Sequence, residues 1–242
     1  MVRPAGCSRC RLAVTVDGTP RSAQVHLPGG IERSQAAPVV LSFHGLDGSA
    51  AVQQATDGLD GVADSEGFVV ICPEGLDVGL NDRVNGTTGW DADGSQVDEA
   101  AFVAAVLDQV EREVCIDRTR VFATGFPAGG NIALVVACEL QGRIAAVAPV
   151  GTAYQRSGCP DGSALPLIAF HGTDDLIVPV DGRDDAAGTI VAVLDAVEAH
   201  AAQNGCDPEP PTEAPMARGP QTSVPPVQRP ADERPPGPAT RR

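Results

Sequence analysis

Short, almost wholly apolar runs recur along the chain: APVVLSFHG at 37–45, GFVVICPEG at 67–75, IAAVAPV at 144–150 and PLIAFHG at 166–172. Continuous apolar runs of this length are typical of parallel strands that are buried on both faces. Segments with apolar residues at helical spacing separate them, the clearest being Phe102, Val103, Val106, Leu107 and Val110, then Ile132, Val135, Val136 and Leu140. A further helix is expected at about 187–204. The alternation predicts an α/β fold, with a mostly parallel sheet and helices on both faces.

Two different segments flank this alternation. Residues 11–28 alternate apolar and polar positions on both sides of an Asp-Gly turn, which predicts a β-hairpin. From Asp207 to Arg242 the chain has 11 of its 21 prolines and no Ile, Leu, Phe, Tyr or Trp. Such a segment cannot bury enough apolar surface to offset the entropy of ordering it. We therefore predict one folded domain at 1–206 and a disordered, proline-rich tail at 207–242.

Charge and cysteine content restrict the partners and the compartment. The formal net charge of −15 argues against nucleic acid and anionic membrane surfaces as partners. No apolar run reaches the roughly 18 residues of a membrane span, and the N-terminus MVRPAGCSRCRLAV has no signal-peptide core. Seven cysteines favour an oxidising compartment with one thiol left unpaired, although their pairing is open. The Cys7–Cys10 pair has neither a second pair at zinc spacing nor a thioredoxin-like continuation, so we expect no metal or cofactor.

The stretch VFATGFPAGGNIALVVAC at 121–138 predicts a buried strand, a glycine-flanked turn and a helix. The same arrangement presents the nucleophilic serine of a G-x-S-x-G elbow in ester hydrolases. Here the central position, between Gly125 and Gly129, is Pro127. The alternative is an ordinary strand-to-helix turn, because proline is a good first residue of a helix.

Several pieces of the chain, in order, resemble the secreted polyhydroxybutyrate depolymerase and feruloyl or acetylxylan esterase group of the α/β-hydrolase fold. They are VVLSFHGLDGSA, DSEGFVVICPEGL, the segment from GWDADGSQVDE to VFATGF, the GG that follows, ACELQGRIAAVAPVGTAY and FHGTDDLIVPVDG. The resemblance covers about residues 5–206. It implies an α/β-hydrolase fold without its last strand and histidine loop, and no cofactor. It also implies serine acyl-transfer hydrolysis of extracellular polyesters or polysaccharide esters, and an extracellular location.

In that group the elbow reads G-F-S-N-G-G, so Pro127 occupies the serine position and Ala128 the asparagine position. Proline has no hydroxyl to carry an acyl group between the two steps of hydrolysis. Its ring also holds φ near −65°, whereas the elbow nucleophile is strained, usually with positive φ. We therefore expect the turn to be reshaped.

The resemblance assigns the remaining site residues as follows. The triad acid corresponds to Asp175 in HGTDDLIVP, where it would orient a histidine, the alternative being an aspartate in a solvated turn. The loop HGLDGS at 44–49 corresponds to the oxyanion loop, so that the backbone N–H groups of Leu46 and Ala128 would donate to the developing alkoxide. His44 and Trp90 would border the substrate cleft, the alternative being that both are packing residues.

The general base of the group lies in a G-G-H-x-W-P loop, which this chain lacks. Its four histidines are His26, His44, His171 and His200, and we expect packing roles for them rather than a role as base. With two of three triad members missing, we expect a catalytically impaired member of this carboxylic-ester hydrolase family. The alternatives are a non-catalytic ligand-binding relic and the product of a degraded or frameshifted gene.

Overall fold

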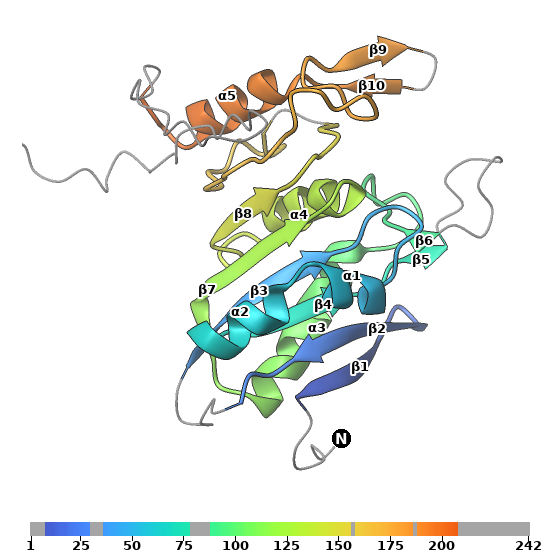
Figure 1. The fold of residues 1–242 in the computed structure, drawn as a ribbon, viewed down its shortest axis with the longest axis vertical. Coiled ribbons are helices and arrows are strands. Elements are labelled where there is room, and N and C mark those ends of the chain that lie inside the picture. The colour runs from blue at the N-terminus through green and yellow to red at the C-terminus, as the bar shows by residue number, and fades with distance from the viewer. Residues whose placement is uncertain (1–7, 30–35, 78–87, 156–157, 186–187, 208–242) are drawn as a thin grey trace, which may run out of the picture.

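The computed structural model describes residues 8–29, 36–77, 88–155, 158–185 and 188–207 (Figure 1). Its centre is a six-stranded sheet in the order β1-β2-β4-β3-β7-β8. The strands are β1 Arg9–Val16, β2 Thr19–His26, β3 Ala37–Phe43, β4 Val69–Pro73, β7 Ile116–Gly125 and β8 Ala146–Pro149. β2 pairs antiparallel with β1 and β4, and the remaining pairs are parallel. The predicted hairpin and mostly parallel sheet are confirmed.

Alternation along the strands divides the sheet into two faces. Val39, Leu41 and Phe43 of β3 point into the main core, together with α3 (Glu99–Glu113) and α4 (Ala128–Glu139). On the opposite face, Val70 and Cys72 of β4 pack against α1 (Ala50–Thr56) and α2 (Leu59–Glu66), as Figure 1 shows. Helices therefore lie on both faces, as predicted.

Helices cover the two halves of the sheet unevenly. α1 and α2 lie over β2, β3 and β4, whereas α4 is the described helix that packs extensively on β7 and β8. Phe122 on β7 is 36% exposed and Phe170, beside β8, is 38% exposed. The predicted strand at 166–172 lies parallel to β8 and joins it through isolated bridges at Leu167 and Phe170.

The predicted helix at 187–204 begins later than expected. It is α5, Val193–Gln203, and a short hairpin of β9 (Arg183–Asp185) and β10 (Gly188–Ile190) precedes it. The β-branched residues Thr189, Ile190 and Val191 favour the extended backbone over the helix, which accounts for the difference. Hairpin and helix lie beyond β8, at the end of the molecule opposite β1 (Figure 1).

Side-chain amides and a disulfide fasten α5 to the rest of the chain. Gln203 accepts from the Cys159 N–H at 2.8 Å and donates to the Cys159 carbonyl at 2.9 Å. Asn204 pairs in the same way with the backbone of Leu165, at 2.6 and 2.9 Å. A disulfide joins Cys159 to Cys138 at the end of α4. The helix is thereby tied, through segment 159–165, to the main core.

The expectation of a single unpaired thiol is wrong. Cys72, buried under α1 and α2, and Cys115, exposed at the start of β7, both carry free thiols. Cys72 lies on β4 and Cys115 directly precedes β7, and neither forms a disulfide.

The tail at 208–242 and the N-terminal Cys7 lie outside the described residues, so the predicted domain boundary stays a prediction. None of the described helices has the length and apolarity needed to cross a membrane. β5 (Leu76–Asp77) pairs with β6 (Thr88–Gly89) as a small separate sheet beside the end of β3.

Candidate active site

Glycines let the first turn of α4 lie directly against the ends of β3 and β7. A Cβ atom on Gly125 would lie 2.7 Å from the Phe43 carbonyl oxygen, and one on Gly129 would lie 2.7 Å from the His44 carbonyl oxygen. A Cβ on Gly130 would lie 2.9 Å from the Gly125 carbonyl oxygen. Any side chain at these positions would force helix and sheet apart. The glycines of the 125–130 turn are thus required by the packing of strand against helix.

Pro127 continues directly into the helix. Its φ of −75° and ψ of −39° are helical, and its carbonyl accepts a hydrogen bond from Gly130 N–H at 3.2 Å. The turn therefore lacks the positive φ that an elbow nucleophile adopts. Phe126, immediately before it, is 55% exposed. The position that the resemblance assigns to the nucleophile thus holds a residue with no hydroxyl and with an unstrained backbone.

The loop after β3 approaches the same turn. A Cβ on Gly45 would lie 2.7 Å from the Phe126 carbonyl oxygen and 2.9 Å from Pro127 Cδ. Leu46 follows Gly45, so its backbone lies next to the start of α4. Among the described residues, none accepts a hydrogen bond from the backbone N–H of Leu46 or of Ala128. That these two N–H groups donate to one bound oxygen, as the resemblance implies, stays a prediction.

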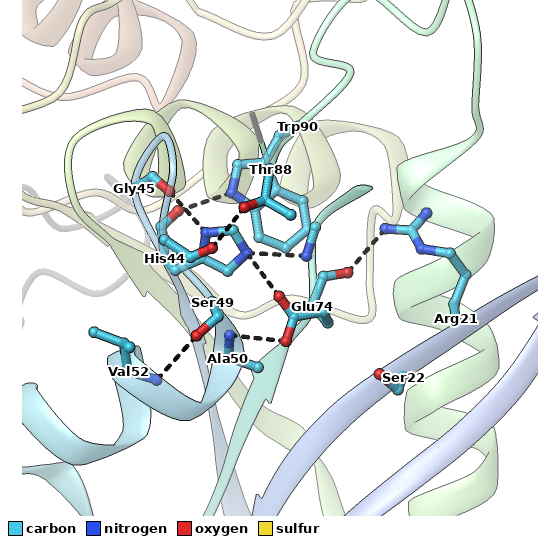
Figure 2. Close-up of polar contacts among 12 residues, drawn as sticks. Arg21, Ser22, His44, Gly45, Ser49, Ala50, Val52, Glu74, Thr88 and Trp90 are labelled. Atoms are coloured by element: carbon cyan, nitrogen blue, oxygen red, sulfur yellow. Dashed lines mark hydrogen bonds and ion pairs between the residues drawn. The ribbon is translucent and has the colours of Figure 1, made fainter. Parts of the chain in front are cut away.

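The 44–48 loop is held in place by β6 and by Trp90, which follows it (Figure 2). Asp47, which has a left-handed φ of 58°, donates its N–H to the Thr88 carbonyl at 2.8 Å. The Thr88 hydroxyl donates to the Gly48 carbonyl at 2.9 Å. The Trp90 indole N–H donates to the His44 carbonyl at 2.8 Å. Three contacts from one short segment thus fix a strained turn.

His44 and Trp90 are buried rather than exposed to a cleft. They are 1% and 5% exposed, and their ring centroids lie 4.7 Å apart. Gly45 O accepts from His44 Nδ1 at 2.7 Å, and Gly75 N–H donates to His44 Nε2 at 2.9 Å. Burial lowers the pKa of His44. The geometry fits the packing alternative, in which both side chains support the 44–48 loop from behind.

Asp175 lies in the turn that follows the 166–172 segment. Its Oδ1 accepts from the N–H groups of Ile177 and Val178, both at 2.9 Å, and these bonds lower the pKa of the carboxyl. A Cβ built on Gly151 would lie 3.9 Å from Asp175 Oδ2 and 2.7 Å from the Phe126 ring. Asp175 and the Phe126 ring thus lie on the same side of Gly151, and the Asp175 side chain is 24% exposed. Its neighbour Asp174 is exposed.

The remaining histidines either form hydrogen bonds with other groups or are buried. His26 bonds to Asp64 at 2.9 Å, on the far side of the sheet beside α2. His171 donates from Nε2 to the Val178 carbonyl at 2.7 Å and lies 3.9 Å from Asp175. His200 is 2% exposed, and burial lowers its pKa. Each has a position expected of a packing residue.

Comparison with known proteins identifies the relationship. The model of the dienelactone hydrolase family matches residues 29–200. The chain belongs to this family. Among its relatives is the bifunctional acetylxylan esterase/xylanase XynS20E of Neocallimastix patriciarum, 30% identical over 158 residues, which are 65% of this chain and 22% of the relative. Another is feruloyl esterase C of Emericella nidulans, 30% identical over 141 residues, or 58% of this chain and 44% of the relative.

This member of the dienelactone hydrolase family thus spans less than half the length of both relatives. A solved structure, that of a thermostable esterase, superimposes with a TM-score of 0.57 at 17% identity, over 81% of this chain and 52% of that one. At that identity the likeness concerns the fold alone. It confirms the α/β-hydrolase architecture expected from the sequence.

Residues that the sequence did not single out complete the support of the loop. Glu74 accepts from Ala50 N–H at 3.1 Å, at the start of α1. Arg21 on β2 donates to the Glu74 carbonyl at 3.2 Å and to the Glu99 carboxylate at 2.8 Å. Thr88 also belongs to this group of supporting residues. The sequence offered a signal for Glu74, because it follows an apolar run at the end of a predicted strand. Its partners could not be predicted, because they come from distant parts of the chain.

Proposed function

We propose that this chain keeps the ester-binding end of a serine carboxylic-ester hydrolase and is impaired in the hydrolysis itself. The observation that carries the proposal is Pro127, which has a helical backbone and no hydroxyl at the elbow position. Ester hydrolysis by acyl transfer forms a bond between the nucleophile oxygen and the acyl carbon and then breaks it with water. Without that oxygen the covalent intermediate cannot form.

The proton-transfer partner is missing as well. A base must take the proton from the nucleophile and later return it to the leaving alcohol. His171, the histidine nearest to Asp175, uses Nε2 to donate to a backbone carbonyl and is itself buried. In subtilisin, removal of the serine or the histidine alone costs roughly 10⁶ in kcat. A chain lacking both is expected to show residual turnover at best.

Binding of an ester does not need those two groups. The Leu46 and Ala128 N–H groups would donate to the ester carbonyl oxygen, beside the positive end of the α4 dipole. Exposed apolar side chains belong to the same two segments, with Phe126 55% and Leu46 48% exposed. This observation favours the second candidate function, a non-catalytic module that holds a neutral ester. Anionic ligands are disfavoured by the net charge of −15.

The names of the relatives support a substrate class. Their names, acetylxylan esterase and feruloyl esterase, favour acetyl or feruloyl esters of plant polysaccharide, and the sequence resemblance adds hydroxyalkanoate polyesters. Such substrates are polymers, which agrees with an extracellular location. The Cys138–Cys159 disulfide supports the same compartment.

Hydrolysis of p-nitrophenyl acetate and butyrate tests the proposal. We expect the unmodified chain, Pro127→Ser and Asp175→Ala all to match the buffer rate while circular dichroism shows folded protein. Pro127→Ser gains a hydroxyl but finds no base to accept its proton. Turnover by the unmodified chain that Asp175→Ala abolishes would overturn the proposal and reveal an unrecognised nucleophile.

Ester binding is measured separately, by calorimetry with ethyl ferulate. Phe126→Ala removes an exposed ring at the site. The matched control is Phe122→Ala, which removes an exposed ring on β7, away from the turn. The binding candidate expects weaker affinity for Phe126→Ala alone. Equal affinity in both variants would argue against binding at the elbow.

A further inference from the structure

His44 is held in one tautomer by two backbone groups (Figure 2). Its Nδ1 lies 2.7 Å from the Gly45 carbonyl oxygen, which can only accept, so Nδ1 carries the ring proton. Gly75 N–H donates to Nε2 at 2.9 Å, so Nε2 presents its lone pair. The imidazole is therefore neutral, with both nitrogens satisfied.

A carboxylate lies beside the nitrogen that would take a second proton. Glu74 Oε1 is 3.8 Å from His44 Nε2, while Glu74 Oε2 accepts from Ala50 N–H at 3.1 Å. Glu74 and Gly75 are adjacent in the chain, so the present donor and the alternative acceptor reach Nε2 from the same turn. A shift of about 1 Å would bring Oε1 to the distance of a charge-assisted hydrogen bond.

Few other charges act on the ring. The groups that contact the ring from other parts of the chain are the Trp90 ring, the Gly48 backbone and the Gly75 N–H, none of which ionises in the physiological range. Asp91, which follows Trp90, has its carboxylate bound to the N–H groups of Gln96 and Val97. Burial lowers the pKa of His44, and the nearby Glu74 charge opposes that shift. Burial thus favours the neutral form of His44, and the Glu74 carboxylate favours the protonated form.

We propose that protonation of His44 is a switch that releases the 44–48 loop. A solvent proton added at Nε2 places a ring N–H against Gly75 N–H, so that hydrogen bond breaks and Nε2–H turns to the Glu74 carboxylate. Gly75 packs tightly against both groups. A Cβ on it would lie 3.0 Å from the His44 ring and would overlap the Gly89 carbonyl oxygen, so a shift of Gly75 away from Nε2 changes its contact with Gly89.

Displacement of Gly75 therefore moves Gly89, and with it the Thr88 and Trp90 contacts that hold the loop. The N–H of Leu46 belongs to that loop. The consequence for ester binding rests on the proposed function, because it assumes that Leu46 contacts the ester. The switch itself can be detected without any ligand.

Trp90 is the only tryptophan of the chain, and its ring lies 4.7 Å from that of His44. Because an imidazolium quenches a neighbouring indole, we expect loss of Trp90 emission as the pH falls, with one midpoint below about 6.5. Ring ¹⁵N signals should show His44 changing from the Nδ1–H tautomer to imidazolium at the same midpoint. Glu74→Gln should lower the midpoint.

His44→Gln keeps an acceptor near Nε2 and cannot take a proton, so the emission change should vanish in this variant. If His44→Gln does not fold, the ¹⁵N titration of the unmodified chain decides, together with the amide shifts of Asp47 and Gly48. Trp90 emission reports protonation alone, so titration of His44 in folded protein without any change in the Asp47 and Gly48 amide shifts would overturn the switch. So would a His44 that stays neutral until the chain unfolds. Binding of ethyl ferulate at neutral pH does not depend on the titration of His44. Loss of that binding would therefore contradict the proposed function, whereas the pH titration tests the switch.

Discussion

Arg21 and Glu99 form an ion pair that is almost completely removed from water. The two groups lie 2.8 Å apart and each side chain is 2% exposed. The guanidinium also lies 3.8 Å above the centre of the Phe102 ring. Burial outweighs the attraction of Arg21 and raises the pKa of the Glu99 carboxyl. The pair thus does little more than offset its own desolvation, although loss of one partner leaves a buried charge alone.

We therefore expect Glu99→Gln to lower the free energy of unfolding by about 3–5 kcal/mol. The double variant Arg21→Met/Glu99→Leu removes both charges and keeps most of the volume. It should lie within about 2 kcal/mol of the unmodified chain, or above it. The difference between the sum of the single changes and the double change measures the coupling.

Urea unfolding at neutral pH, followed by circular dichroism, gives these free energies. The control is Asp108→Asn, which breaks a 2.8 Å pair with Arg143 whose side chains are 32% and 51% exposed. That change should cost less than about 1 kcal/mol. If Glu99→Gln costs no more than the control, the argument from burial is refuted.

Two further outcomes are expected. Gly129→Ala should destabilise the chain by about 1–3 kcal/mol, because its Cβ would overlap carbonyl groups at the end of β3. Gly61→Ala in α2, where a Cβ meets nothing within 4 Å, should stabilise it by about 0.5–1 kcal/mol, and equal melting temperatures would contradict this. His200 is buried with a lowered pKa, so its contribution is complete above about pH 6.5 and is lost as the pH falls. The melting temperature of His200→Gln should fall less on acidification, and an unchanged slope would exclude this role.

The strands of the central sheet could be predicted because each is a short apolar run that is visible in the local sequence. Runs such as 37–45 and 67–75 became central strands, since no other position in the fold accepts them. The start of α5 was missed because Thr189 and Ile190 prefer an extended backbone, which the expected helix ignored. The Cys138–Cys159 pairing depends on the approach of two distant segments, which spacing alone does not determine.

In the candidate site, too, local motifs could be predicted from the sequence and long-range contacts could not. Asp175 and Leu46 were assigned by resemblance to neighbouring motifs, and whether they act on an ester stays a prediction. The contacts that hold the loop join residues far apart in sequence, such as Thr88 with Gly48. Buried charge on Arg21 has no sequence signature, because an arginine in a hairpin is ordinarily exposed.

The amides that fasten α5 have a consequence for hydrogen exchange. Gln203 and Asn204 each replace one rung of a β-ladder, so the N–H groups of Cys159 and Leu165 are protected only while α5 stays docked. Their exchange rates report the detachment of α5 as an event separate from global unfolding. Because the disulfide retains segment 159–165 on α4, the helix can leave and return without loss of the sheet. We therefore expect the C-terminal part of the fold to open as a unit, and faster exchange at Cys159 and Leu165 than in β3 and β7 would show it.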